Sequence, residues 1–177
     1  GAEVTRLAEV RFTNTARDEA RGRMESQLVS IRREASTLQH QLAGIDVELE
    51  ELGDVALQSG ATLKDARLAY KTYGTLDPAG SNVVVLPTFY TGTHIRNEGY
   101  FGRGRAIDPA RHFIVSINLF GNGLSSSPSN SATPQNGPRF PSVTLFDNVA
   151  CQYRLLTERL GVQRIAMPTN GNAGAAA

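Results

Sequence analysis

Cysteine is almost absent from this sequence, since Cys151 is the single one among 177 residues. A lone cysteine excludes an internal disulfide framework and a cysteine-rich metal site, and it fits a reducing compartment, so we expect a cytoplasmic protein. The three histidines, His40, His94 and His112, lack metal-ligand spacing, and the phosphate-binding pattern G-x-x-x-x-G-K-[ST] is missing. The sequence therefore predicts neither a metal nor a cofactor.

Net charge and long apolar runs are also lacking. The 18 Lys and Arg residues against 17 Asp and Glu residues leave a net charge of +1, which provides no electrostatic footprint for nucleic acid or an anionic membrane. No apolar run approaches the roughly 18 residues of a membrane span. The N-terminus lacks the apolar core of a signal peptide. We expect no nucleic-acid partner and no membrane span.

Proline, lysine and aromatic residues are scarce in the first part of the chain. All eight prolines lie at or after Pro78, and eleven of the twelve Phe and Tyr residues lie at or after Tyr70. Residues 1–52 carry a net charge of −3 (seven Arg against ten Asp or Glu), and residues 53–177 carry +4 (eleven against seven). We interpret the chain as a helical segment 1–52, a partial domain 53–167 and a flexible tail 168–177 of small residues.

What the first segment does have is a regular apolar stripe. An apolar residue recurs every three or four positions, the a/d spacing of a coiled coil: Met24, Leu28, Ile31, Ala35, Leu38, Leu42, Ile45, Leu49 and Leu52. The stripe predicts one helix over residues 16–52, with Gly53 as its C-terminal stop. We expect this helix to form a homodimer through residues 24–52. The alternative is an amphipathic helix that lies on its own domain or stays exposed.

Beyond Gly53 the pattern changes to short strands. Residues 53–59 and 66–73 alternate apolar and polar positions around Gly60, which predicts an antiparallel hairpin. Two β-branched runs follow, VVVLP and FIVSIN, and a third run begins as RIAM; all three are typical of strands buried on both faces. A helix is predicted over residues 142–160. Together these elements indicate an α/β fold, an antiparallel hairpin followed by parallel strands, preceded by the long coiled-coil-like helix.

Two long loops follow the predicted buried strands, at residues 87–106 and 118–141. Both are rich in Gly, Ser and Asn and contain aromatic residues. Ligands of open α/β sheets bind at the carboxyl ends of the strands, where both loops begin. Loops of this length are usually functional or disordered, and their aromatic residues argue against disorder. We therefore expect a ligand-facing edge.

Several ordered segments of the second region resemble one known family. They read LGDVALQSGATLKDARLAYKTYGTL, VVVLPTFYTGTH, HFIVSINLFGNGLSSSPSN and LLTERLGVQRIA, over about residues 52–167. The run resembles the homoserine O-acetyltransferase-like branch of the α/β-hydrolase superfamily. The resemblance implies the N-terminal half of an α/β-hydrolase domain and either acyl transfer to a hydroxyl or ester hydrolysis through a Ser-Asp-His triad. It also implies small-molecule substrates, an ester or acyl-CoA as acyl donor and an acceptor alcohol.

The same resemblance implies where part of the reactive site lies. It assigns one backbone N–H donor of the oxyanion hole to Tyr90, with Phe89 beside it. Further residues of the two loops would line the acyl or alcohol pocket: Thr91, Gly92, His94, Arg96, Asn97, Asn122, Gly123 and Ser125.

The nucleophile of the family is missing from the sequence. In the family, the strand that begins here as RIAM runs into a G-x-S-x-G elbow that carries the serine. This chain continues as PTNGNAGAAA instead and contains no G-x-S-x-G anywhere. Spacing places His94 in no serine–histidine–acid set, so no catalytic residue is predicted, and we expect a truncated chain that is inactive alone. The alternative is a non-enzymatic coiled-coil interaction or adaptor protein.

Overall fold

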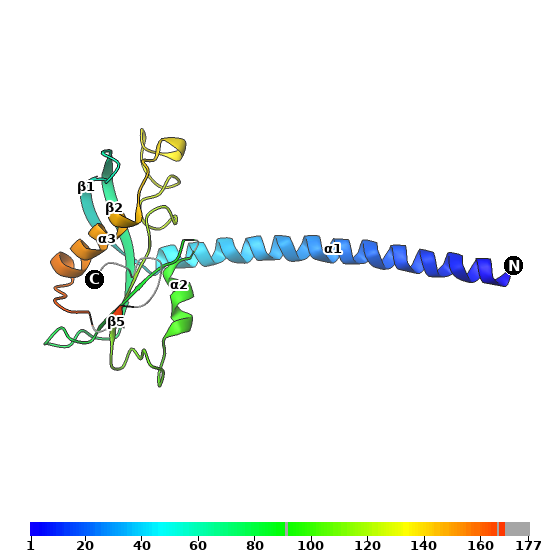
Figure 1. Ribbon diagram of the computed structural model, residues 1–177, viewed down its shortest axis with the longest axis horizontal. Helices are drawn as coiled ribbons and strands as arrows, with labels where there is room; N and C mark the ends of the chain where they lie inside the picture. Colours follow the sequence, from blue (N-terminus) through cyan, green and yellow to red (C-terminus); the bar gives the residue numbers. More distant parts are fainter. Residues whose placement is uncertain (91, 166, 169–177) are drawn as a thin grey trace. The chain divides into compact units, whose positions relative to one another are not determined.

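The computed structural model describes residues 1–90, 92–165 and 167–168 of the chain (Figure 1). The chain divides into two compact units, Gly1–Gln41 and Leu42–Ala177. We call them the helical unit and the sheet unit. Within the described residues, no helix combines the length and the apolar character needed to cross a membrane.

A single long helix, α1 (Ala2–Ile45), makes up the helical unit and continues into the first residues of the sheet unit. It begins well before residue 16, where the sequence predicted its start. The large apolar side chains of the stripe are half exposed or more, at 50–63%: Met24, Leu28, Ile31, Leu38 and Leu42. The long helix is thus confirmed, whereas its pairing with a second helix stays a prediction.

The predicted end of this helix at Leu52 is wrong. The helix ends at Ile45, and strand β1 (Glu48–Ala56) begins three residues later. Pairing with the next strand buries Leu52 to 7% exposure in the sheet core, and this tertiary burial outweighs the helical spacing. Gly53 has a φ of +66° at an irregularity in the β1–β2 register, so its backbone freedom serves a bulge in a strand instead of a helix stop.

The sheet has five strands in the order β1-β2-β4-β3-β5. The hairpin partner of β1 is β2 (Thr62–Tyr73), and β2 also pairs antiparallel with β4 (Phe113–Ile117). The remaining strands, β3 (Val83–Pro87) and the short β5 (Met167–Pro168), complete a parallel set with β4. An antiparallel hairpin followed by parallel strands is therefore confirmed.

Both faces of the sheet are covered, because alternate strand side chains point to opposite sides. On one face the core includes Val83, Val85 and side chains from α3 (Leu145–Arg154) and a π-helical turn, η3 (Leu155–Arg159). On the other face, Val84 and Leu86 pack with the chain that follows α2 (His94–Asn97) and the 3-10 turn η1 (Glu98–Tyr100). A further 3-10 turn, η2 (Gly137–Arg139), lies in the loop after β4.

Helix α3 starts at Leu145, later than predicted, because Thr144 and Asp147 form a capping box there. Asp147 also accepts a hydrogen bond from the Gln58 N–H at 2.7 Å, which joins the helix start to the β1–β2 turn. Burial raises the pKa of the Asp147 carboxyl, but hydrogen bonds from Thr144 and Gln58 outweigh it, and the pKa lies below its usual value.

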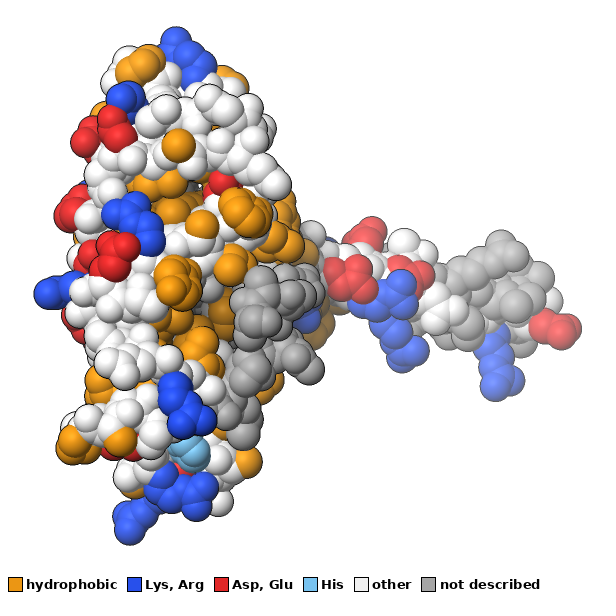
Figure 2. Space-filling view, turned by 60° about the vertical axis from the view of Figure 1, so that its left-hand side comes forward, with side chains coloured by type: hydrophobic (Ala, Val, Ile, Leu, Met, Phe, Trp, Pro, Cys, Tyr) orange, Lys and Arg blue, Asp and Glu red, His pale blue; other side chains and the backbone are white. Residues whose placement is uncertain are grey.

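Apolar side chains also reach the surface of the sheet unit. Figure 2 shows hydrophobic side chains over the centre of one of its faces, with charged side chains mainly toward the rim. Exposures of 51–66% are found on α3, at Leu145, Phe146 and Tyr153. The helix predicted over residues 142–160 therefore has an exposed apolar side as well as a buried one.

Candidate functional site

The loop after β3, residues 88–93, is attached to the end of β4. The Thr88 N–H donates to the carbonyl of Ile117 at 2.9 Å, and the Thr88 hydroxyl accepts from the Leu119 N–H at 3.2 Å. The loop then turns tightly, since the Gly92 N–H donates to the Phe89 carbonyl at 2.9 Å. A Cβ at Gly92 would lie 2.7–3.0 Å from atoms of the Phe89 ring, so a larger residue at this position would displace that ring.

Tyr90 and Phe89, the predicted oxyanion-hole residues, occupy the outer part of this turn. The Tyr90 side chain is 88% exposed, and among the described residues none accepts a hydrogen bond from the Tyr90 N–H. Phe89 is half-buried, and the guanidinium carbon of the exposed Arg96 lies 5.5 Å from its ring centroid. The predicted pocket residue Thr91 falls outside the described residues.

The serines of the loop after β4 form hydrogen bonds to backbone groups of the sheet unit. Ser125 is fully buried, and its hydroxyl accepts from the Ala69 N–H at 2.9 Å and donates to the Asn118 carbonyl at 2.7 Å. The Ser126 hydroxyl accepts from the Arg67 N–H at 2.8 Å. These bonds continue the pairing of β2 beyond the end of β4. The structure thus encloses the predicted pocket residue Ser125 instead of placing it on an open surface.

Asn122 joins the two loops. Its side-chain amide donates to the Gly92 carbonyl at 3.3 Å and to the Asn118 side-chain oxygen at 3.0 Å. Its own side-chain oxygen accepts from the Leu124 N–H at 3.0 Å. The neighbouring Gly123 is partly buried, with a φ of +91° that favours glycine. The structure therefore brings Gly92 and Asn122 together, and their lining of a common pocket stays a prediction.

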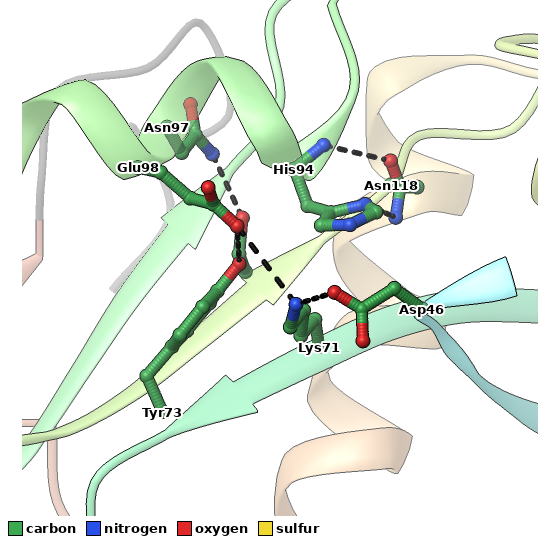
Figure 3. Close-up of polar contacts among 8 residues, drawn as sticks. Asp46, Lys71, Tyr73, His94, Asn97, Glu98 and Asn118 are labelled. Atoms are coloured by element: carbon green, nitrogen blue, oxygen red, sulfur yellow. Dashed lines mark hydrogen bonds and ion pairs between the residues drawn. The ribbon is translucent and has the colours of Figure 1, made fainter. Parts of the chain in front are cut away.

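His94 and Asn97 are the first and last residues of α2, and both are buried and not on an open surface. Asn97 is 3% exposed and donates to the Leu86 carbonyl at 2.8 Å and the Ser116 hydroxyl at 2.9 Å. His94 is fully buried, and its backbone N–H donates to the Asn118 side-chain oxygen at 3.1 Å (Figure 3). Both residues fix α2 to the ends of β3 and β4.

A group of charged residues that the sequence did not single out faces the same side of the sheet. The Lys71 amine pairs with Asp46 and lies 3.8 Å from a Glu98 carboxylate oxygen, which also accepts from the Tyr73 hydroxyl at 2.8 Å (Figure 3). Burial and the Glu98 contact raise the pKa of the Tyr73 hydroxyl. Lys71 and Tyr73 lie two positions apart on β2 and so share one face of the sheet. No sequence spacing links them to Glu98, so only the fold reveals the group.

A groove of about 280 Å³ opens elsewhere on the sheet unit, between the β1–β2 hairpin and the loop after β4. Its lining carries charges of both signs, from Glu51, Lys64, Asp65 and Arg67. Within the described part of the chain, no three His, Cys, Asp or Glu side chains gather as a metal-binding group.

Comparisons with known proteins connect this geometry to a family. No family model matches the chain. An ethyl acetate hydrolase from Pseudomonas veronii is 40% identical over 129 residues, 72% of this chain and 37% of that protein. A homoserine O-acetyltransferase from Salinibacter ruber is 38% identical over 127 residues, 68% of this chain and 36% of that protein. The chain thus spans little more than a third of the length of these relatives.

Solved structures agree with the sequence relatives. The acetyl esterase MekB superimposes with a TM-score of 0.65 and 39% identity, over 67% of this chain and 35% of that chain. A homoserine O-acetyltransferase from Bacillus anthracis superimposes with a TM-score of 0.58 and 25% identity, over 67% of this chain and 38% of that chain. Over the matched residues, the chain carries part of an α/β-hydrolase domain of the homoserine O-acetyltransferase-like branch, as its sequence predicts.

Proposed function

We propose that this chain supplies the oxyanion-binding loop and one wall of the substrate pocket for an ester-hydrolysing or acyl-transferring site. The observation that carries the proposal is the tight turn closed by the Gly92–Phe89 hydrogen bond, in which the Tyr90 N–H has no acceptor among the described residues. The relatives support the reaction class, since their names describe hydrolysis of ethyl acetate and O-acetylation of homoserine.

The chemistry of the loop follows from its geometry. A tetrahedral intermediate carries a developing negative charge, and a backbone N–H held in place lowers its energy. The bonds of Thr88 to the end of β4 and the Gly92–Phe89 turn hold the loop in place before substrate arrives. Gly92, Asn122 and Gly123 form the adjoining wall in this proposal, and Arg96 and Phe89 form its outer rim.

The second half of the proposal is that the chain alone turns over no ester, because it contains no G-x-S-x-G nucleophile elbow. We expect purified protein to hydrolyse p-nitrophenyl acetate no faster than a heat-unfolded sample of the same protein. A serine-directed phosphonate should label nothing. Saturable turnover that the phosphonate abolishes would overturn this half of the proposal.

Cys151 does not replace the missing serine. The thiol is 1% exposed, and its burial, opposed by Arg154, raises the pKa to about 11. A nucleophilic cysteine needs the thiolate form and access to substrate, and Cys151 has neither. We also assign the chain to the cytoplasm, a proposal that rests on its single cysteine.

A chimera tests the oxyanion role directly. We would replace the matching segment of the Pseudomonas veronii hydrolase with residues 83–131 of this chain and measure kcat/KM on ethyl acetate. Tyr90→Pro in the chimera removes the N–H and should lower kcat by about 100-fold to 1,000-fold. Tyr90→Ala keeps the N–H and serves as the control. Equal activity of the two variants, at equal melting temperature, would contradict the assignment.

A second candidate function is self-association through α1. The exposed stripe from Met24 to Leu42 supports it, because a solvated helix rarely presents apolar residues at a/d spacing without a partner. Leu49 and Leu52 belong to β1, so the proposed helix–helix contact, which we call the seam, is shorter than residues 24–52. In this candidate function, α1 forms the contact between two copies of the chain, and the sheet unit is the domain attached to it.

Sedimentation equilibrium separates the possibilities. We expect a concentration-dependent homodimer that Leu28→Lys dissociates, since the substitution puts a charge in the seam. Val29→Lys is the matched control, because Val29 is 48% exposed but lies outside the a/d stripe. A monomer throughout the micromolar range, or equal dissociation by both variants, would exclude the dimer.

A further inference from the structure

Three segments of the sheet unit meet at the side chain of Asn118, which is fully buried just after β4. Its oxygen accepts from the His94 N–H at 3.1 Å and from the Asn122 side-chain amide at 3.0 Å. Its nitrogen donates to the Ala69 carbonyl on β2 at 3.1 Å and lies 3.3 Å from Nδ1 of His94. One amide group therefore joins β2 to both loops of the proposed site.

The neighbours determine which way this amide faces. A flipped Asn118 would set its NH₂ group against two donors and its oxygen against the Ala69 carbonyl. The nitrogen must consequently face the His94 ring, where it donates to Nδ1 (Figure 3). A ring whose Nδ1 accepts a hydrogen bond carries its proton on Nε2. Nε2 is buried and has no hydrogen-bond partner among the described residues.

Charged groups on two neighbouring segments act on the same ring. Burial lowers the pKa of His94, and the charge of Lys71 on β2 lowers it further. Glu98 on η1 acts in the opposite direction, and the hydrogen bond to Asn118 does so as well. Asp46 faces the ring less directly, through its ion pair with Lys71. The net result favours the neutral imidazole near pH 7.

We propose that His94 and Asn118 form a pH-sensitive latch that sets the position of the oxyanion loop relative to the loop after β4. This inference rests on the proposed function for its relevance to catalysis, since both residues act through Tyr90 and Asn122 and touch no substrate. They are positioning residues. The latch is closed while Nδ1 accepts from Asn118.

Protonation opens the latch for a simple reason. A proton on Nδ1 faces the Asn118 NH₂ group, so two donors oppose each other and the hydrogen bond is lost. Asn118 cannot rotate to offer its oxygen without abandoning the His94 N–H and the Asn122 amide. Protonation thus leaves the His94 backbone N–H as the only bond from His94 to Asn118 among the described residues, and the side-chain bond that fixes the His94 end of the loop is lost. A site built on this loop would lose its ordered N–H donor in mildly acidic solution.

Nuclear magnetic resonance of the full chain with ¹⁵N-labelled histidine tests the latch without any ester. We expect His94 in the Nε2–H form, with a pKa below the ordinary histidine value. The backbone amides of Tyr90, Gly92 and Asn122 should shift with the midpoint of His94. A protonated Nδ1 at pH 7, a pKa at or above the ordinary value, or loop amides that do not follow His94 would each overturn the proposal.

Two variants should each prevent opening, for different reasons. Asn118→Asp places a carboxylate beside the ring, so the pKa of His94 should rise above its ordinary value. The protonated Nδ1 then donates to that carboxylate, so protonation of His94 should no longer move the loop amides to the open positions of the wild type. His94→Asn retains an acceptor near the position of Nδ1 but does not titrate, so the loop amides should keep their neutral-pH positions down to pH 5. A loop that still titrates in His94→Asn would overturn the latch, and this variant remains informative if Asn118→Asp does not fold.

His112→Gln is the matched control. His112 is half-buried, and its Nδ1 contacts the backbone of Asp108 just before β4, at the opposite end of that strand from Asn118. It should leave the His94 midpoint and the loop amides unchanged, and a change in either would contradict the proposal. The resonance data and the chimera activity are independent measurements. An inactive chimera with a titrating loop would refute the oxyanion role alone, and an active chimera with a static loop would refute the latch alone.

Discussion

The helical unit and the sheet unit differ in how far they bury the same types of apolar residue. On α1, Leu28, Ile31 and Leu38 are 50–60% exposed, whereas Leu63, Leu68 and other aliphatic residues of the sheet unit are fully buried. A helix satisfies its backbone hydrogen bonds internally, so its backbone pairing does not by itself cover the apolar stripe. A strand must pair with a neighbour, and pairing brings the side chains of both strands onto shared faces. Apolar periodicity alone therefore does not reveal whether a residue is buried.

The boundary between the two units shows this most directly. Leu42 and Leu52 belong to the same uninterrupted stripe, yet Leu42 is 60% exposed on α1 and Leu52 is 7% exposed in β1. The difference lies in partners, since β2 runs beside β1 over most of its length. Matched substitutions in the two units should therefore change the free energy of unfolding by different amounts or in opposite directions.

The largest contrast should come from truncating a leucine in each unit. Leu68→Ala leaves a cavity in the sheet core and should lower the free energy of unfolding of the sheet unit by about 2–5 kcal/mol. Leu28→Ala changes a residue of the helical unit, outside the sheet core, and should change the free energy of unfolding of the sheet unit by less than about 0.5 kcal/mol. Urea unfolding followed by tyrosine fluorescence measures both, because all five tyrosines lie in the sheet unit. Equal destabilisation would mean that the helix packs against the sheet.

Glycine substitutions should differ in sign. Gly74 has a φ of +76°, and a Cβ there would overlap the carbonyl oxygens of Pro109 and His112. Gly74→Ala should therefore destabilise the sheet unit by about 2–3 kcal/mol. Gly22→Ala meets nothing within 4 Å and should stabilise the helix by about 1 kcal/mol. Gly60→Ala isolates the backbone effect, since φ is +83° and the space is open. Thermal melts at 222 nm compare the three.

A smaller contrast is expected between a buried and an exposed carboxylate. Asp147→Ala removes the capping box and the bond to Gln58, and should cost about 1–2 kcal/mol. Glu25→Ala breaks an ion pair whose side chains are 68–75% exposed, and should leave the free energy of unfolding unchanged within measurement error. Chemical denaturation at pH 7 tests both variants. A larger effect of Glu25→Ala would show that the helix ion pairs matter more than the cap.

The Asp147 contrast also has a pH dependence. Because the folded state lowers the pKa of this carboxyl, its stabilising contribution is complete above the unfolded pKa of about 4 and is lost as the pH falls through the folded value. Wild-type protein and Asp147→Ala should therefore converge in stability toward pH 2. Melting temperatures recorded between pH 7 and pH 2 measure the convergence. A constant difference across that range would show that the carboxylate charge plays no part in the cap.

Part of the fold was predictable because strong local signals agreed with the tertiary structure. The β-branched runs around Val84 and Val115 form parallel strands, and the loops that follow them carry the candidate site. The polar group of Lys71, Tyr73 and Glu98 was not predictable, because its members come from β2 and η1 and meet only when α2 packs on the sheet. Likewise, no spacing shows that Ser125 and Asn97 are enclosed by backbone groups.

The sequence by itself determined the family, the parallel strands and the long helix, because these depend on short-range periodicity and on runs of residues shared with relatives. Only the tertiary structure decided where α1 ends, which polar side chains are buried and how the two loops are joined. Those features depend on strand pairing and on hydrogen bonds between residues far apart in the chain. Asn118 is the clearest case, since its side chain bonds to residues that lie 24 and 49 positions away.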